Sequence, residues 1–204
     1  MDKWDRRYAA REYPTDQDPS PVLRALVTSF PDGRALDVGT GPGRNALFLA
    51  GEGYEVDAID KSREGLELAR EQADERGVEV NWIRADAREY AYPTDAYDVV
   101  TASFYRPFER LTDVKGALAE DGVLFLQQHV RTTDETAIGP TGDRYRLAAN
   151  ELLRATLDLT VLHYEERIER RTDGERSAVS TVVARNSHEQ AQSYPDDPRP
   201  GEVS

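Results

Sequence analysis

The chain has 204 residues, which suits one α/β domain with a sizeable hydrophobic core better than two small ones. Its 39 acidic and 26 basic residues give a net charge of −13, which repels phosphate backbones, so we expect no nucleic-acid partner. The sequence has no cysteine, which excludes disulfides, zinc–thiolate sites and a cysteine nucleophile. The 3 histidines lack the spacing of metal ligands, so no metal is expected either.

The distribution of apolar and charged residues bears on location. The sequence has no run of about 20 apolar residues and begins without the apolar segment of a signal peptide, so we expect a cytoplasmic protein without membrane contact. The basic residues are almost all arginine, and acids are in excess. This acidic composition also suggests the hypothesis of a halophilic protein, because salt screens self-repulsion. Monomer and homodimer both stay open.

The first 19 residues are polar but carry three large rings outside any periodic pattern, at Trp4, Tyr8 and Tyr13. Two interpretations are open for this segment. It is either a strap packed against the core or a lid that covers a ligand and excludes water. A helix is expected to start at Ser20 and Pro21, so we expect the folded domain to span residues 20–186.

The stretch 36–45 is the strongest local signal in the chain. An apolar run ends in Asp37, glycines follow at 39, 41 and 43, and an apolar helix pattern comes next. Glycine is needed where the backbone takes a positive φ or comes close to a ligand, and we expect Pro42 to start the helix. The free N–H groups of its first turn would then face the ligand. Such a turn holds NAD, FAD or S-adenosylmethionine, so it predicts a nucleotide cofactor without naming it.

Strand and helix patterns alternate after this turn. A helix is predicted over residues 62–76, and another through Leu111, Val114 and Leu118 that leads to a turn at 120–122. Further strands are predicted at 55–59, 78–84, 98–102 and 123–130. The alternation predicts an α/β fold with a doubly wound, mostly parallel sheet whose ligands bind at the carboxyl ends of the strands.

The C-terminal part breaks this alternation. A short helix is predicted near residues 150–157, followed by two strands at 159–170 and 176–185 that form a hairpin. This hairpin would add an antiparallel edge to the parallel sheet. Residues 187–204 are polar and rich in proline, which predicts a disordered tail.

Aspartates stand at the ends of successive predicted strands. Asp60 lies 21 residues after Gly39, where a carboxylate can accept hydrogen bonds from both ribose hydroxyls of NAD or of S-adenosylmethionine. Asp86 and Ala87 follow the third strand and suit an adenine edge, because the carboxylate accepts from the amino group while the backbone N–H donates to a ring nitrogen. Helix capping and loop solvation are the structural alternatives. For Asp37 a structural role and a direct contact stay equally open.

At this point the chain resembles the class I S-adenosylmethionine-dependent methyltransferases, and among them the small tellurite-resistance and thiopurine-methyltransferase-like group. The resemblance covers about residues 4–186. It implies a seven-stranded, Rossmann-like sheet whose last two strands are the C-terminal hairpin. The motifs that carry it are 36–45 with its Gly-Arg-Asn ending, 53–62, Ala85-Asp86, Tyr97-Asp98 and 120–122.

The resemblance also implies roles for residues of the cofactor site. The glycine loop would hold the methionine part of S-adenosylmethionine, Asp60 the ribose, and Asp86 with Ala87 the adenine. Ser103 and Phe104 would line the crevice of methyl transfer. The cofactor-binding residues predicted in this way are Asp37, Gly39, Thr40, Gly41, Gly43, Arg44, Asn45, Asp60, Lys61, Ser62, Asp86, Ala87, Ser103 and Phe104.

The chemistry of the sulfonium limits what a catalytic residue must do. A nucleophile held in line with the methyl group, in a site free of water, is sufficient, so a soft anion or a thiolate needs no base. Arg106, Arg171 or Arg44 could hold an anionic acceptor, although each by itself fits better as a surface or salt-bridge residue. Tyr105 and His129 are the candidates for proton handling, and His129 has a structural alternative at a strand end.

Two departures from known patterns concern the acceptor. Tellurite-resistance relatives have a His-Arg pair in the last hairpin, whereas this chain reads Arg170-Arg171. Methylation of amide or adenine nitrogens is disfavoured, because residues 102–105 read Ala-Ser-Phe-Tyr where those enzymes usually carry Asn/Asp-Pro-Pro-Tyr/Phe. We therefore expect direct methyl transfer to a small molecule or an inorganic oxyanion. The alternatives are an NAD(P)-dependent oxidoreductase and a non-catalytic S-adenosylmethionine-binding protein.

Overall fold

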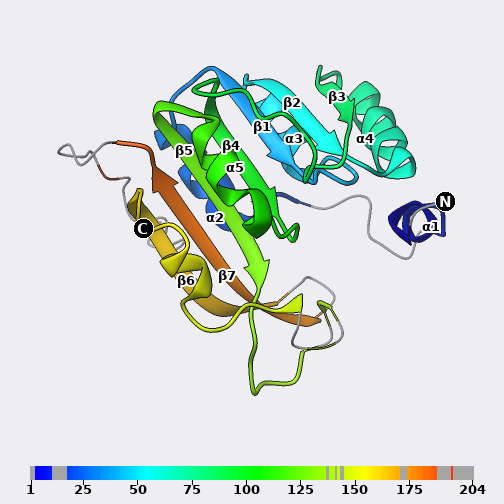
Figure 1. The fold of residues 1–204 in the computed structure, drawn as a ribbon. Helices are drawn as coiled ribbons and strands as arrows, with labels where there is room; N and C mark the ends of the chain where they lie inside the picture. Colours follow the sequence, from blue (N-terminus) through cyan, green and yellow to red (C-terminus); the bar gives the residue numbers. More distant parts are fainter. Residues whose placement is uncertain are drawn as a thin grey trace, which may run out of the picture.

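A seven-stranded sheet forms the centre of the molecule in the computed structural model (Figure 1), which describes residues 3–10, 18–136, 138–140, 142, 145–170, 174–187 and 194. The strands are β1 (Arg34–Val38), β2 (Glu55–Asp60), β3 (Asn81–Arg84), β4 (Tyr97–Ser103), β5 (Leu118–His129), β6 (Thr160–Arg170) and β7 (Arg176–Arg185).

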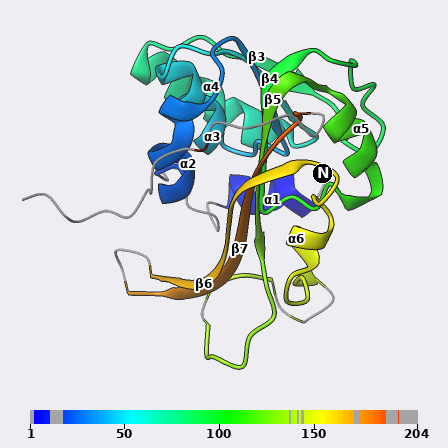
Figure 2. The same ribbon diagram turned by 90° about the vertical axis from the view of Figure 1, so that its left-hand side faces the viewer.

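Helices cover both faces of this sheet. The α-helices are α1 (Lys3–Ala9), α2 (Pro21–Leu26), α3 (Arg44–Gly51), α4 (Arg63–Arg76), α5 (Leu111–Gly116) and α6 (Glu151–Arg154), and short 3₁₀ turns span Val27–Ser29 and Phe108–Arg110. Figure 2 shows α2, α3 and α4 on one face of the sheet and α5 and α6 on the other. In the described part of the chain no helix has the length and apolar character to cross a membrane.

The strand order is β3-β2-β1-β4-β5-β7-β6. The first five strands are parallel, and β7 pairs antiparallel with both β5 and β6. The predicted fold class is therefore confirmed, including the antiparallel hairpin at the C-terminal edge. The chain reverses its winding direction between β1 and β4, so their carboxyl ends border the crevice where such sheets bind ligands.

Side chains of β1 alternate between two core layers, as a strand buried on both faces requires. Leu36 and Val38 pack in a cluster that also holds residues of α5, whereas Ala35 packs in a cluster with Leu23 of α2 and Leu49 of α3. The side chains of Ala35, Leu36, Val38, Leu23 and Leu49 are all buried. The central strand is thus fixed from both faces, which holds the glycine turn at its carboxyl end in a defined position.

The structure corrects the expected end of the helix through Leu118. That residue is the first of β5, and it pairs with Tyr97 of β4. The predicted turn at 120–122 is an irregularity within this strand, where Asp121 has a φ of 62° and donates its N–H to the Asn186 carbonyl at 2.8 Å. Helical spacing of Val114 and Leu118 was misleading, because the sheet edge captures the backbone from Leu118 onward.

Three further boundaries differ from the prediction. Helix α3 begins at Arg44 rather than Pro42, because Gly43 takes the capping position with a φ of 87°. The Ser20 hydroxyl does not cap α2 but lies 3.2 Å from the Gln127 amide nitrogen. The third strand starts at Asn81 rather than 78. Of the predicted disordered tail at 187–204, all but residues 187 and 194 lies outside the described residues, as does Tyr13.

Replacement of Gly43 by alanine should destabilise the fold more than the same change at Gly53. Both glycines have a positive φ, of 87° and 98°, so both variants bear the backbone cost of about 1 to 2 kcal/mol. Only at Gly43 would the added Cβ meet core atoms, Trp82 at 2.9 Å and Ala69 at 3.0 Å. We expect Gly43→Ala to lose about 1 kcal/mol or more beyond Gly53→Ala in urea unfolding. Equal losses would contradict close packing beneath the loop.

Candidate functional site

A cavity of about 340 Å³ lies at the carboxyl ends of β1, β2 and β4. It is lined by most of the predicted cofactor residues, namely Asp37, Gly39, Thr40, Gly41, Arg44, Asn45, Asp60, Lys61, Asp86, Ala87, Ser103 and Phe104. Gly43 and Ser62 do not line it. Instead they cap helices α3 and α4 directly behind the lining. The fold thus brings the sequence-predicted cofactor residues to one place.

The glycine loop forms one wall of the cavity in a left-handed backbone conformation that glycine adopts without strain. Gly39 and Gly41 have φ values of 71° and 54°. A Cβ on Gly39 would lie 2.6 Å from Tyr105, and one on Gly41 would lie 2.6 Å from the Tyr8 hydroxyl. These positions therefore need glycine both for their φ and for space, as the sequence predicted for a close-approach turn.

Asp60 ties this loop to the start of helix α4. One carboxylate oxygen accepts the Gly41 N–H at 2.8 Å and the other accepts the Ser62 N–H at 2.8 Å. Burial raises the pKa of Asp60, and the two backbone hydrogen bonds act against that rise. Each carboxylate oxygen has a second lone pair, so the group can accept two further hydrogen bonds from ligand hydroxyls.

Asp86 at the opposite end of the cavity is engaged by a residue that the sequence analysis did not single out. Arg88 donates from Nε to Oδ1 at 3.0 Å and from Nη2 to Oδ2 at 2.7 Å. This pairing and the Arg88 backbone N–H lower the pKa of Asp86 to about 2. Arg88 itself lines the cavity, as does Glu109, which was also missed. The spacing Asp-x-Arg after a strand was the one signal for Arg88.

Asp37 lies deeper and is almost fully buried. The Thr101 hydroxyl of β4 donates to its Oδ1 at 2.6 Å, so the acid joins two neighbouring parallel strands. Burial raises the pKa of Asp37, against the effect of the Thr101 hydrogen bond. A structural role is therefore evident, while the same residue also lines the cavity.

Two buried polar atoms in the cavity wall have no partner in the protein. The side-chain amide of Asn45 donates to Ser103 Oγ at 2.9 Å, but its Oδ1 makes no hydrogen bond, and neither does Thr40 Oγ1. Both residues are buried and line the cavity. Unsatisfied buried acceptors are costly, so they indicate a polar ligand that supplies the missing donors.

Helix α1 covers one side of the cavity. Trp4 and Tyr8 both line it, with their rings stacked at a centroid distance of 6.1 Å. The Ser62 hydroxyl donates to Asp5 Oδ1 at 2.7 Å and accepts the Gly65 N–H at 3.1 Å. The N-terminal segment is thus packed on the domain and also faces the ligand cavity, so its described part has features of both earlier interpretations.

The predicted catalytic residues are divided by the structure. Tyr105 and Arg106 line the cavity, whereas Arg171 lies outside the described residues. Burial raises the pKa of the Tyr105 phenol. Arg106 lies 3.7 Å from the Glu151 carboxylate and above the Phe108 ring at 5.4 Å.

His129 does not line the cavity but packs behind its wall. Its ring stacks on Phe104 at a centroid distance of 4.5 Å, and its Nδ1 lies 3.0 Å from Ser177 Oγ. Burial, with the charges of Arg146 and Arg44, lowers the pKa of His129 to about 4, so the ring is neutral at pH 7. This placement favours the structural alternative. Phe104 has a φ of 56°, and such backbone outliers cluster at functional sites.

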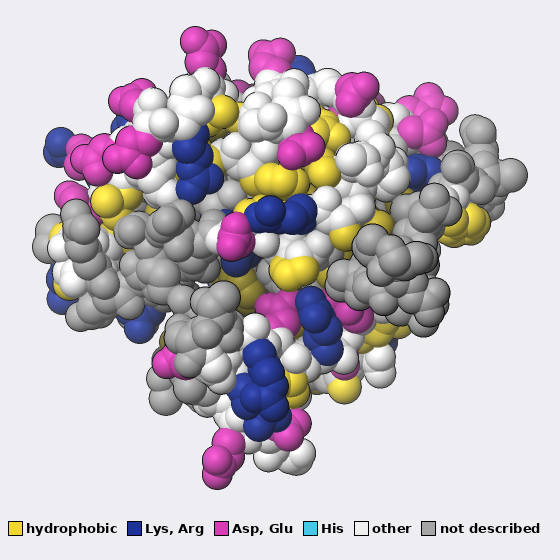
Figure 3. Space-filling model, turned by 180° about the vertical axis from the view of Figure 1, so that it is seen from behind, with side chains coloured by type: hydrophobic (Ala, Val, Ile, Leu, Met, Phe, Trp, Pro, Cys, Tyr) yellow, Lys and Arg dark blue, Asp and Glu magenta, His cyan; other side chains and the backbone are white. Residues whose placement is uncertain are grey.

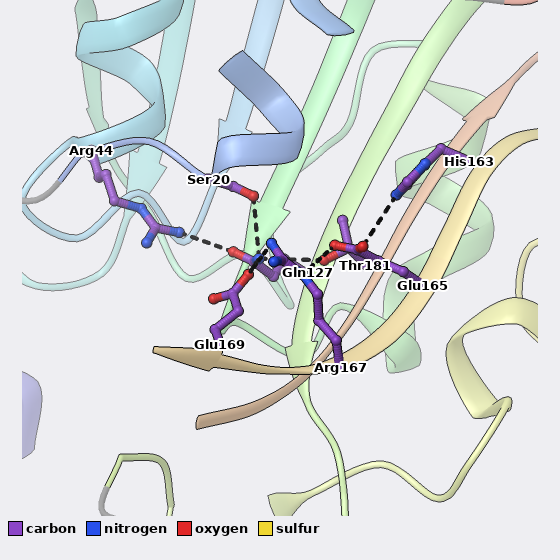
Figure 4. Close-up of polar contacts among 8 residues, drawn as sticks. All are labelled: Ser20, Arg44, Gln127, His163, Glu165, Arg167, Glu169 and Thr181. Carbon is purple, nitrogen blue, oxygen red and sulfur yellow. Dashed lines mark hydrogen bonds and ion pairs between the residues drawn. The ribbon is translucent and has the colours of Figure 1, made fainter. Parts of the chain in front are cut away.

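A polar cluster connects the cavity with the C-terminal hairpin (Figure 4). Arg44 donates to Gln127 Oε1 at 3.4 Å, while Gln127 Nε2 lies 3.2 Å from Glu169 Oε1 and 3.3 Å from Thr181 Oγ1. Arg167 adds a contact of 3.1 Å to the Glu169 carboxylate. Burial raises the pKa of Glu169, against the charges of Arg167 and Arg44.

Comparison with known proteins agrees with this geometry. Residues 35–121 match the family described as "Methyltransferase domain". Demethylmenaquinone methyltransferase of Thermus thermophilus is 39% identical over 89 residues, which cover 43% of this chain and 40% of that protein. Ubiquinone biosynthesis O-methyltransferase of Aeromonas salmonicida is 44% identical over 69 residues, covering 33% and 29%. The chain thus spans less than half the length of these curated relatives.

The same fold occurs in TehB from Haemophilus influenzae, with a TM-score of 0.70 and 22% identity over 90% of this chain and 67% of that one. The strand order and this likeness define a class I methyltransferase fold. The matched domain over residues 35–121 and this likeness of fold agree with the sequence-based recognition of a class I S-adenosylmethionine-dependent methyltransferase. S-adenosylmethionine, the cofactor of that family, is likewise the one predicted from the sequence.

Asp60→Ala should weaken binding of S-adenosylhomocysteine by about 2 kcal/mol or more, roughly 30-fold in Kd, through lost charged hydrogen bonds. Calorimetric titration measures the change. Glu55→Ala, at the exposed start of the same strand, serves as the control and should leave Kd unchanged. Asp60→Asn tests the charge separately, since its amide keeps one acceptor oxygen. Unchanged affinity in both Asp60 variants would remove this residue from the site.

Acid should destabilise the protein through His129. Its folded-state pKa of about 4 is below the ordinary 6.5, so the unfolded chain binds the proton more readily and stability falls as pH drops from 6.5 toward 4. The contribution lost between about pH 7 and pH 4.5 is about 2 to 3 kcal/mol. In urea unfolding, the free energy of unfolding of the wild type should fall by about this amount more than that of His129→Gln over the same pH range. Equal acid losses in both proteins would show that His129 is not its source.

Proposed function

We propose that this protein transfers the methyl group of S-adenosylmethionine to a small molecule or an inorganic oxyanion. The observation that carries the proposal is the cavity at the β1–β4 crevice, whose wall combines a glycine loop with positive φ angles, the Asp60 carboxylate and two buried polar oxygens without partners. A ligand with ribose hydroxyls and an amino group supplies the donors that these acceptors lack.

The residues of the cavity divide the work of binding. Asp60 would accept the ribose hydroxyls, and Asp86 with the Ala87 backbone would hold the adenine. The glycine loop would hold the amino-acid end, where Asn45 Oδ1 and Thr40 Oγ1 face their missing partners. When bound, S-adenosylmethionine supplies an electrophilic methyl group, so the protein needs to position the acceptor and exclude water.

Several aromatic side chains are placed to exclude water. Trp4 and Tyr8 of α1 border the cavity on one side, and Phe104 with Tyr105 border it beyond β4. We propose α1 as the cover of the bound cofactor, fixed to the domain by the hydrogen bond between Ser62 and Asp5. A dry cavity strengthens charge interactions and protects the sulfonium from hydrolysis.

The lining holds basic side chains that would contact an anionic acceptor, balanced by acids. Arg44, Lys61, Arg88 and Arg106 border the cavity together with Asp37, Asp60, Asp86 and Glu109. Elsewhere the surface suits nucleic acid poorly. On the face in Figure 3, Lys and Arg side chains lie apart from one another, separated by acidic, apolar and uncharged groups. With the net charge of −13, this supports a small-molecule substrate and argues against a nucleic-acid partner.

The two alternatives differ in what they bind and turn over. An NAD(P)-dependent oxidoreductase shares the glycine turn and Asp60, but it gives no role to Asp86. A non-catalytic S-adenosylmethionine-binding protein shares every cofactor residue and lacks turnover. Neither the described lining nor the fold favours an oxidoreductase over the methyltransferase family to which the chain is similar.

Parallel calorimetric titrations with S-adenosylhomocysteine and NADH should show binding of S-adenosylhomocysteine alone. A methyl-transfer screen of thiols, selenite, tellurite and halides should then show turnover, with protein heated beyond unfolding as the control. Binding of NADH alone would overturn the proposal. Tight cofactor binding without turnover on any acceptor would favour the non-catalytic alternative.

A further inference from the structure

Arg88 holds the Asp86 carboxylate from three directions. Besides the side-chain contacts of 3.0 Å and 2.7 Å, the Arg88 backbone N–H donates to Oδ1 at 3.0 Å. The planar guanidinium matches the two carboxylate oxygens and so fixes the rotation of the group as well as its position. Both residues line the cavity, and nothing in the sequence motifs assigns a role to Arg88.

The contacts leave Asp86 with one open acceptor position. An ionised carboxylate offers about four lone-pair positions, two on each oxygen. Oδ1 accepts from Arg88 Nε and from the Arg88 backbone N–H, while Oδ2 accepts from Nη2 alone. The remaining position is therefore on Oδ2, and its direction is set by the guanidinium.

The backbone that carries Asp86 is held as well. Its carbonyl accepts the N–H groups of Glu89 and Tyr90, both at 2.9 Å, and the Tyr92 hydroxyl donates to the Ala87 carbonyl at 2.9 Å. The carboxylate is thus attached to a turn with little freedom. The Asp86 side chain would therefore gain rotational freedom mainly if its contacts with Arg88 were lost.

We propose that Arg88 is a positioning residue that sets the base specificity of the cofactor site. It directs the one open acceptor of Asp86 Oδ2 toward an exocyclic amino group and so selects adenine over a base with an oxo group at that place. This proposal rests on the proposed function, because it takes S-adenosylmethionine as the ligand of the cavity.

The selection follows from the hydrogen-bond inventory. An ionised carboxylate has no proton to donate, so a carbonyl at the same place sets lone pair against lone pair and leaves two acceptors unpaired. Asp86 is ionised at neutral pH even at the ordinary pKa of an aspartate, and Arg88 lowers its pKa further, to about 2. The side chain of Arg88 is 59% exposed, so the pair adds little to stability and its effect is on orientation.

The test compares two ligands that differ at this position of the base and at the adjacent ring nitrogen, which accepts a hydrogen bond in adenine and carries a proton in hypoxanthine. The difference at the ring nitrogen is the same for the wild type and the variants, so the change in preference between them reports on Arg88. Calorimetry gives Kd for S-adenosylhomocysteine and for S-inosylhomocysteine, which carries hypoxanthine, in the wild type and in Arg88→Ala. We expect Kd for S-adenosylhomocysteine to rise about tenfold in Arg88→Ala, whereas Kd for S-inosylhomocysteine changes less than about threefold. The preference for adenine then falls by about threefold or more.

Two further variants separate orientation from charge and from general effects. Arg88→Lys keeps the charge but cannot form the planar two-point contact, so it should lose the preference as Arg88→Ala does. Arg24→Ala is the control, because Arg24 forms a comparable exposed pair with Asp18 at 2.8 Å, outside the cavity lining, and it should keep the wild-type preference. Thermal unfolding confirms that each variant is folded.

The outcomes distinguish this proposal from the proposed function. Wild-type binding with an unchanged preference in Arg88→Ala, or full preference in Arg88→Lys, would overturn the positioning role of Arg88 alone. If the wild type bound neither ligand, the proposed function would fail and the role of Arg88 with it. A parallel loss of affinity for both ligands would show that Arg88 only supports the loop.

Discussion

The hydrogen bonds of Asp60 are the constraint on which the cavity depends. Its two carboxylate oxygens accept from Gly41 in the glycine loop and from Ser62 at the start of α4, both at 2.8 Å. The acid stands at the carboxyl end of β2, which pairs with β1. It therefore fixes the glycine loop and the start of α4 relative to the sheet. Through the Ser62 hydroxyl the same contact extends to Asp5 of α1. The glycine loop, the start of α4 and helix α1 are therefore linked through one carboxylate, the same group that we propose as the acceptor of the ribose hydroxyls.

The sheet could be predicted from the sequence because its signals are local. Apolar strands, the glycine turn at 39–43 and the Ser62 cap each show their structure in a few neighbouring residues. Boundaries were wrong where tertiary contacts decide them. Leu118 has helical spacing with Val114, yet the neighbouring β4 draws its backbone into the sheet. Pro42 suits a helix start, but Gly43 takes the capping position with a positive φ, so the helix starts two residues later, at Arg44.

The site was predictable to the extent that its residues stand at strand ends. Asp37, Asp60 and Asp86 all reach the cavity because parallel strands end at the same edge of the sheet. Arg88 was missed because arginine two residues after an aspartate resembles any surface pair, and only the fold shows that the pair borders a cavity. For His129, the sequence indicated a strand end but gave no sign that Phe104 would line the cavity and stack on the imidazole, which does not line it.

The C-terminal hairpin is joined to the cofactor loop by Gln127, a residue buried within β5. Its Nε2 carries two hydrogens but lies near three acceptors, on Ser20, Glu169 and Thr181. The two hydroxyls can rotate and donate elsewhere, whereas the ionised carboxylate can only accept. Glu169 is therefore the partner that most needs the amide, while the opposite end of Gln127 accepts from Arg44. The ladder between β5 and β7 positions the hairpin, and one amide then connects it with a cavity-lining arginine, which gives the antiparallel edge of the sheet a direct connection to the site.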